Sequence, residues 1–171
     1  MDGPAVLRAH EEDAVAAHRA FLRRIGRDPN RDHSPQEAAY HDRIFHGAFP
    51  VRDALQDLLL VVLLETGVPI WAIDADRTDG ELGLRHSLPG ELQGPRVDAA
   101  HEPPPAATRP EPVVVDGAGV VAEVGREPRD SHRATYRTRR TTFFCARVPG
   151  LPALRVEEAI WLCRSLVDRA R

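Results

Sequence analysis

The sequence contains no lysine, and every one of its 23 basic residues is an arginine. The absence of lysine excludes a Schiff-base lysine, the lysine of a phosphate-binding P-loop and a lysine general base. A GC-rich genome would produce the same preference for arginine codons, so the absence does not by itself indicate a function. It limits the chemistry of the protein in either case.

Cysteines and long apolar segments are also scarce. Cys145 and Cys163 lie 18 residues apart, which fits neither a metal-ligand spacing nor a disulfide framework. The longest apolar run, residues 58–64, is much shorter than the roughly 20 residues that cross a bilayer. The N-terminal segment lacks the basic and apolar regions of a secretory signal. We therefore expect a soluble, cytoplasmic protein without a membrane partner.

The chain of 171 residues is 42% apolar, which is enough for one core, and we expect a single domain over residues 1–171. Its net charge of −3 is unevenly distributed. Residues 1–125 contain 12 arginines and 21 acidic residues, whereas residues 126–171 contain 11 arginines and 5 acidic residues. The simplest expectation is that the basic C-terminal part is neutralised within the fold; the alternative is that it binds an anion.

The first 66 residues predict helices. Apolar residues recur at helical spacing between Pro4 and Gly26, and Ser34 with Glu37 forms a capping box that predicts a helix from residue 35 to about 45. A third helix is expected from Pro50 to residue 65, although the run at 58–64 could instead form a buried strand.

The remaining residues predict strands and one last helix. The segments 68–75 and 81–87 flank Asp79-Gly80, which predicts a hairpin, and 113–115 with 120–124 predict a second one. Residues 89–112 contain seven of the 15 prolines, which predicts a loop or linker. A strand over 139–148 and a helix over 152–170 complete the chain. Helices followed by strands predict an α+β fold, with N-terminal helices, a mainly antiparallel sheet from the C-terminal half and a closing C-terminal helix.

Two aspartates follow the apolar segment 70–73. The pattern Asp74-x-Asp76-x-Thr78 resembles the motif that opens the active site of haloacid-dehalogenase-like phosphatases. That resemblance implies a nucleophilic Asp74 and a general acid at Asp76. The parallel sheet and later acidic pair of that family have no counterpart here, so we expect the aspartates to lie in a turn.

Arginine is concentrated in residues 125–140, which makes this segment the main candidate for a binding site. Planar guanidinium groups suit bidentate contacts to carboxylate or phosphate. The predicted ligand-binding residues are Arg133, Tyr136, Arg137, Arg139 and Arg140. Nucleic acid is disfavoured because the protein as a whole is acidic. The alternative is that these charges are solvated or paired within the molecule.

The other candidate residues are isolated. Cys145 lies in the predicted strand 139–148 without a nearby base, so we expect a buried thiol. A helical wheel of the last helix places Cys163 and Ile160 together on its apolar face, which should pack against the core. Trp161 falls on the charged face of the last helix, which predicts that the proline-rich loop or another chain covers it. The histidines do not have metal-ligand spacing and are expected to face solvent, so no metal is expected. Residues 117–122 match a short dinucleotide-binding pattern, but Gly125 and Pro128 would stop the helix that such a site requires, so no cofactor is expected either.

Three functions remain open. The first is a small-molecule-binding or regulatory module that recognises an anionic ligand through the arginine-rich segment. The second is a small lyase, cyclase or phosphate-handling enzyme acting on an anionic metabolite; short segments, ETGVPIWA and EVGR, are similar to those of chorismate-lyase-like proteins. The third is a protein-interaction module that uses Trp161 and the proline-rich loop. Its partner would be a second copy of the chain or another protein, bound through the last helix. We favour the first, because anion-receptive groups are present without a recognisable catalytic motif.

Overall fold

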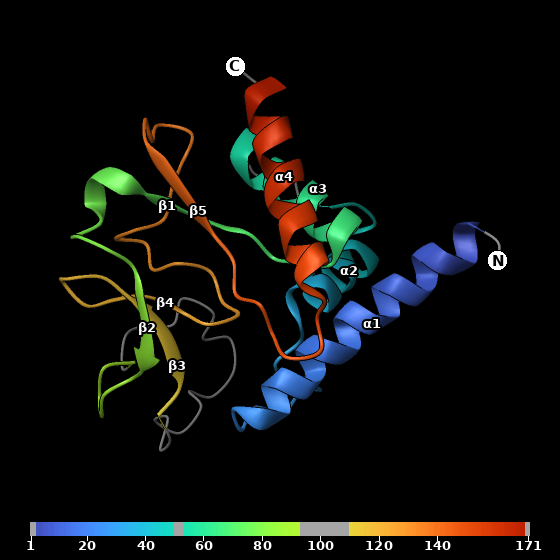
Figure 1. Ribbon diagram of the computed structural model, residues 1–171, viewed down its shortest axis with the longest axis horizontal. Coiled ribbons are helices and arrows are strands. Elements are labelled where there is room, and N and C mark those ends of the chain that lie inside the picture. The colour runs from blue at the N-terminus through green and yellow to red at the C-terminus, as the bar shows by residue number, and fades with distance from the viewer. Residues whose placement is uncertain (1–2, 50–52, 93–109, 170–171) are drawn as a thin grey trace.

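The computed structural model describes residues 3–49, 53–92 and 110–169. Within these ranges the chain forms four α-helices, one short 3-10 helix and five strands. The strands make one sheet of two strands and one of three, and every pairing is antiparallel. Figure 1 shows the helices gathered on one side of the molecule and both sheets on the other. This segregation confirms the predicted α+β fold, with two small sheets in place of one.

Capping signals in the sequence set the start of the second helix. α1 spans Gly3–Arg24 and α2 spans Pro35–His46. The Ser34 hydroxyl accepts a hydrogen bond from the Glu37 N–H at 3.3 Å, and the Glu37 carboxylate accepts one from the Ser34 N–H at 3.0 Å. The predicted capping box is therefore confirmed. Glu37 also forms an ion pair with Arg19 at 2.7 Å, which links α2 to α1.

The third helix starts later than the sequence predicted. α3 spans Ala54–Thr66, because the Asp53 carboxylate accepts the Gln56 N–H at 2.9 Å and caps the helix there. Residues 50–52, where we expected its start, lie outside the described residues. α3 ends at Gly67, whose φ of 71° is left-handed. The alternative strand over 58–64 is wrong. The last helix, α4, spans Ala153–Arg169 and packs against α3.

The three-stranded sheet contains the second predicted hairpin. β2 spans Gly83–His86, β3 spans Pro112–Val115 and β4 spans Val120–Glu123, in that spatial order. The hairpin of β3 and β4 is confirmed. Most of the proline-rich segment, residues 93–109, lies outside the described residues.

The first predicted hairpin is wrong. β1, Trp71–Asp74, pairs with β5, Thr141–Phe144, rather than with β2. The Asp74 carboxylate accepts the Asp76 N–H at 3.0 Å and caps the 3-10 helix η1, Ala75–Arg77, which directs the chain away from β1. Asp79 then contacts the turn between β3 and β4, where its N–H donates to the Asp116 carboxylate at 2.9 Å. The Asp-Gly pair therefore connects two sheets and does not close a hairpin.

The main core lies between the helices and the two-stranded sheet. It includes Ala14, Leu59, Val62, Val68, Ile70, Ala72, Val148, Leu151, Ala159 and Cys163. The prediction that Cys163 is buried is confirmed, whereas Ile160, which the helical wheel placed on the same face, is 53% exposed. His18 is buried as well, contrary to the expectation that the histidines face solvent. Ala14 and Ala17 on α1 belong to the core. His18 lies one helical turn after Ala14 and therefore on the same face of α1, which explains its burial.

None of the helices within the described ranges is long and apolar enough to span a bilayer.

Candidate anion-binding site

The arginine-rich segment runs along one edge of β1 and returns along the other. The carbonyl of His132 accepts a hydrogen bond from the Asp74 N–H at 2.8 Å, and the Ala134 N–H donates to the Ala72 carbonyl at 3.1 Å. The chain then re-enters the sheet as β5 on the opposite edge. Residues 135–140 therefore cross the carboxyl end of β1. We call them the crossing loop.

The crossing loop is attached to the two aspartates. The Thr138 hydroxyl donates to the Asp74 carboxylate at 3.3 Å, and the Ala75 N–H donates to the Arg140 carbonyl at 2.9 Å. The Arg140 guanidinium lies 3.0 Å from the Asp76 carboxylate. Two sequence features that lie about 60 residues apart, the aspartate pair and the arginine-rich segment, therefore meet at one end of the two-stranded sheet.

The predicted ligand-binding arginines differ in what already contacts them. Arg133 pairs with Glu127 at 3.3 Å and with Asp130 at 3.0 Å, so the molecule's own acids engage it. Arg137 lies over the ring of Tyr136, 5.2 Å from its centroid, and its Nε donates to the Tyr136 hydroxyl at 2.9 Å. Within the described part of the chain, neither Arg137 nor Arg139 pairs with a carboxylate. The crossing loop thus presents two guanidinium groups that are not neutralised by any acid of the described residues.

A hollow of about 500 Å³ opens beside Arg140. Its other lining residues are Ala75, Thr78, Gly80, Glu81, Leu82 and Thr142. The hollow is therefore bordered by one guanidinium, two threonines and one acid. Arg140 belongs to the crossing loop and Thr142 to β5, whereas the other lining residues lie in the segment that follows β1. The crossing loop, β5 and this segment therefore build the site together.

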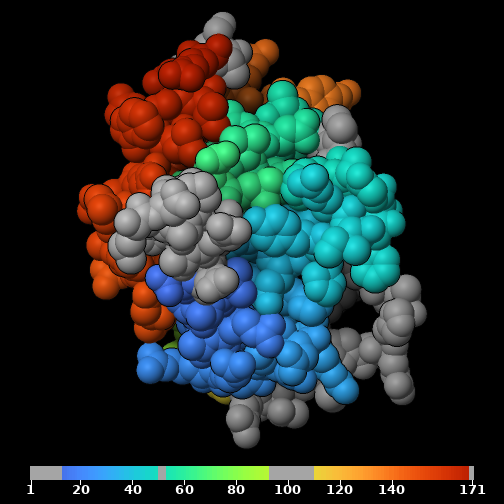
Figure 2. All heavy atoms as spheres, turned by 90° about the vertical axis from the view of Figure 1, so that its right-hand side faces the viewer, coloured from blue at the N-terminus to red at the C-terminus, as the bar shows by residue number. Residues whose placement is uncertain are grey.

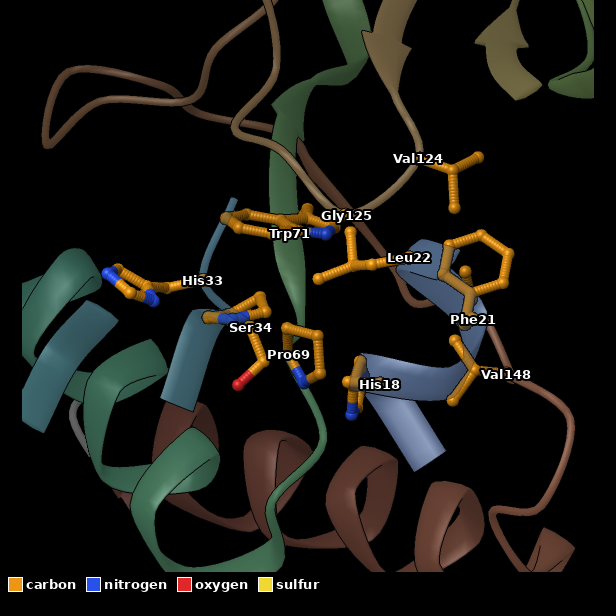
Figure 3. Close-up of a pocket in the computed structure, with 12 residues that line it drawn as sticks. His18, Phe21, Leu22, His33, Ser34, Pro69, Trp71, Val124, Gly125 and Val148 are labelled. Atoms are coloured by element: carbon orange, nitrogen blue, oxygen red, sulfur yellow. The ribbon is translucent and has the colours of Figure 1, made fainter. Parts of the chain in front are cut away.

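A second cavity lies between α1, the start of α2 and β1 (Figure 3). It encloses about 20 Å³, which is room for a single water, and its walls are largely apolar, with Phe21, Leu22, Pro69, Trp71 and Val148 among the residues that line it. His18 also lines it. Burial lowers the pKa of His18, which favours the neutral ring, and its Nδ1 donates to the Ala14 carbonyl at 2.8 Å. In the neutral ring Nε2 is therefore an acceptor. Such a cavity does not suit an anion.

Two other sequence candidates lie elsewhere. Cys145 follows β5, is partly buried and packs against the core, and this burial raises its pKa, which favours the thiol over the reactive thiolate. Trp161 is on α4 and is 67% exposed. Asp74 ends β1 and Asp76 lies in η1, so the two aspartates lead into a 3-10 turn and not into the predicted hairpin. Among the residues that the structure describes, no cluster of three histidine, cysteine or acidic side chains is arranged to hold a metal.

The structure also reveals an arrangement that the sequence did not indicate. Ser131 Oγ lies 2.9 Å from His132 Nδ1, and His132 Nε2 lies 3.3 Å from the Asp116 carboxylate. Burial raises the pKa of Asp116, but hydrogen bonds from the backbone N–H groups of Asp79, Gly119 and Ala118 outweigh burial and hold that pKa below its ordinary value. The order of hydroxyl, imidazole and carboxylate is found in hydrolases. Neither cavity described above is lined by Ser131, so we interpret the group as a brace between the β3–β4 turn and β1.

Comparisons with known proteins identify no relative: no protein family matches this chain, and neither do any curated protein or solved structure. The structure therefore defines the protein by its fold, an α+β arrangement with two antiparallel sheets, and by the guanidinium-lined hollow at the end of the smaller sheet.

Proposed function

We propose that this protein binds a small anionic molecule, a carboxylate or a phosphate, in the hollow at the end of the two-stranded sheet. The observation that carries the proposal is the position of Arg140, which lines a hollow of about 500 Å³. Arg137 and Arg139 belong to the same crossing loop, and neither pairs with an acid among the described residues. Guanidinium groups with free N–H donors recognise these anions by paired hydrogen bonds.

The ion pair between Arg140 and Asp76 does not prevent ligand binding. The Arg140 side chain is 73% exposed and that of Asp76 is 52% exposed, and a pair this exposed contributes little to stability. A ligand anion can therefore replace Asp76 as the partner of Arg140 at small cost. The backbone of Arg140 stays fixed meanwhile, because its carbonyl accepts the Ala75 N–H.

The acids of the site limit the charge of the ligand. Glu81 lines the hollow and Asp76 lies beside it, so both repel a ligand that carries several negative charges. Threonines at 78 and 142 add hydroxyl groups that can bind a neutral part of the ligand. We expect a metabolite with one or two negative charges and an uncharged polar part.

A thermal-shift screen and titration calorimetry with inorganic phosphate, acetate and citrate test the proposal. Phosphate or one of the carboxylates should raise the melting temperature of the parent protein, and Arg140→Ala should abolish that shift. Arg137→Ala combined with Arg139→Ala should reduce it. Arg24→Ala, at an exposed position in the last turn of α1, is the matched control and should leave the shift unchanged. Equal shifts in all variants would exclude the hollow as the binding site.

An enzyme acting on an anionic metabolite is the second candidate. The observation that favours it is the Asp76 carboxylate 3.0 Å from Arg140, because a carboxylate beside a bound anion could transfer a proton. In such an enzyme Asp76→Asn would retain ligand binding and lose turnover. In a binding module the same variant would have no activity to lose and would only change affinity.

A further inference from the structure

The outer face of α4 carries large apolar side chains that nothing in the described structure covers. Trp161 is 67% exposed and Leu154 is 72% exposed. Figure 2 shows α4 at the molecular surface beside α3, which contacts its inner side. Exposed tryptophan is unusual on a monomer surface and is enriched where proteins bind one another.

Helical geometry places these side chains on one stripe. At 100° per residue, Leu154 lies within about 20° of Trp161 around the helix, and Glu157 and Arg164 lie within about 60° of it. The buried residues Ala159 and Cys163 occupy the opposite side. Ile160, 53% exposed, widens the stripe along one flank.

The charges on the stripe have opposite signs on the two sides of Trp161. Glu157 is exposed and lies one turn before it, and Arg164, whose side chain is 83% exposed, lies one turn after it. The distance along the axis from Trp161 is about 5–6 Å in each direction. The one ion pair that Arg164 makes in the described residues is with Asp168, at a long 3.9 Å. Glu157 and Arg164 thus remain available to a partner.

We propose that the stripe binds a second copy of this chain, with the two α4 helices antiparallel and the two Trp161 side chains at the two-fold axis. In this orientation Glu157 of each chain faces Arg164 of the other, which gives two equivalent ion pairs around an aromatic centre. A parallel orientation would place like charges together. A surface that is complementary to itself is what a two-fold interface requires. The contact is one helix wide, so the dimer is weak and in exchange with monomer.

Sedimentation equilibrium over a wide range of protein concentrations tests the dimer. The parent protein should associate, and Trp161→Ala should raise the dissociation constant by more than about tenfold. Leu84→Ala, which removes a 71% exposed apolar side chain from β2, is the control and should have no effect. Circular dichroism should show the same fold for each variant, since both side chains lie outside the core. A parent protein that stays monomeric at all concentrations overturns the proposal, and in that case the stripe belongs to a different partner.

Charge reversal tests the orientation. Glu157→Arg and Arg164→Glu should each weaken association, because each single change places like charges in contact. The double variant carrying both changes should restore association, because the pairs re-form with their signs exchanged. If the double variant is no better than the single ones while Trp161→Ala still dissociates the dimer, the antiparallel pairing is wrong.

Discussion

The guanidinium of Arg27 lies 3.0 Å from the carboxylate of Glu123 and connects the helices to the three-stranded sheet. Arg27 follows α1, and its side chain is 6% exposed. Its Nε also donates to Glu111, just before β3, at 3.0 Å. One buried cation therefore holds two acids, one just before β3 and one at the end of β4, where little solvent can screen their repulsion.

Replacement of Arg27 should destabilise the protein strongly. Arg27→Met removes the buried cation from between Glu111 and Glu123 and leaves Glu123 with its ion pair to Arg126, at 3.2 Å. We expect the free energy of unfolding to fall by about 3 kcal/mol. Urea denaturation at pH 7 measures it. Arg24→Met, at an exposed position one turn earlier, should change stability by less than about 0.5 kcal/mol. Similar losses in both variants would contradict a special role for the buried cation.

Alanine substitutions at Gly67 and Gly47 separate two contributions to the loss of stability, overpacking of the core and backbone strain. Both have left-handed φ, 71° and 72°, but a Cβ on Gly67 would lie 2.6 Å from the Ala14 Cβ, whereas nothing lies within 4 Å of one on Gly47. Gly47→Ala should cost about 1 kcal/mol, the strain alone. Gly67→Ala should cost about 3 kcal/mol, because overpacking against α1 adds to the strain. Thermal or urea unfolding measures both, and equal costs would show that α1 moves away freely.

His18 should make stability depend on pH. Burial lowers its pKa in the folded protein despite the opposing effects of the Ala14 carbonyl and Glu37. As the pH falls below about 6.5, the unfolded chain therefore binds a proton before the folded one does, and the free energy of unfolding decreases.

Comparison of pH 7 with pH 5 tests this contribution. His18→Leu should lose less stability than the parent protein over that interval. His86→Leu, an exposed histidine on β2, should behave like the parent. A His18→Leu variant with the parent's pH dependence would show that other groups control it.

Removal of the competing acid should strengthen anion binding. Asp76→Asn frees Arg140 and removes one negative charge, so the dissociation constant for phosphate should fall by up to about fivefold. Titration calorimetry at low ionic strength measures it. Asp13→Asn, at an exposed position on α1, serves as the control. If Asp76→Asn binds phosphate no better than the parent, Arg140 does not contact the ligand.

The sequence predicted helix ends and hairpins correctly where these depend on contacts between residues that are close in the chain. The capping box at Ser34 and Glu37, the left-handed Gly67 and the β3–β4 hairpin each depend on residues a few positions apart. Asp79-Gly80 gave the wrong prediction. Its hairpin signal was overridden by the capping carboxylate of Asp74 and by the long-range bond from Asp79 to Asp116. Periodicity placed Trp161 on the exposed face correctly, but it misplaced Ile160 at the boundary of that face.

The candidate site was predicted only in its parts. The sequence supplied the aspartate pair and the arginine-rich segment, but it could not show that the crossing loop brings Arg140 to Asp76. Nor could it show that the molecule's own acids already engage Arg133.

The sequence by itself determined which side-chain chemistry is available, since all its basic residues apart from histidine are arginines and it has no disulfide framework. It also determined where most helices begin and end. Those properties follow from residue identity and from hydrogen bonds within one or two turns. The tertiary structure alone decided which strands pair, which arginines pair with acids among the described residues and where the hollow lies. These outcomes depend on pairing between residues about 40 to 100 positions apart, and such contacts are selected by packing and charge in the folded chain, which no short stretch of sequence encodes.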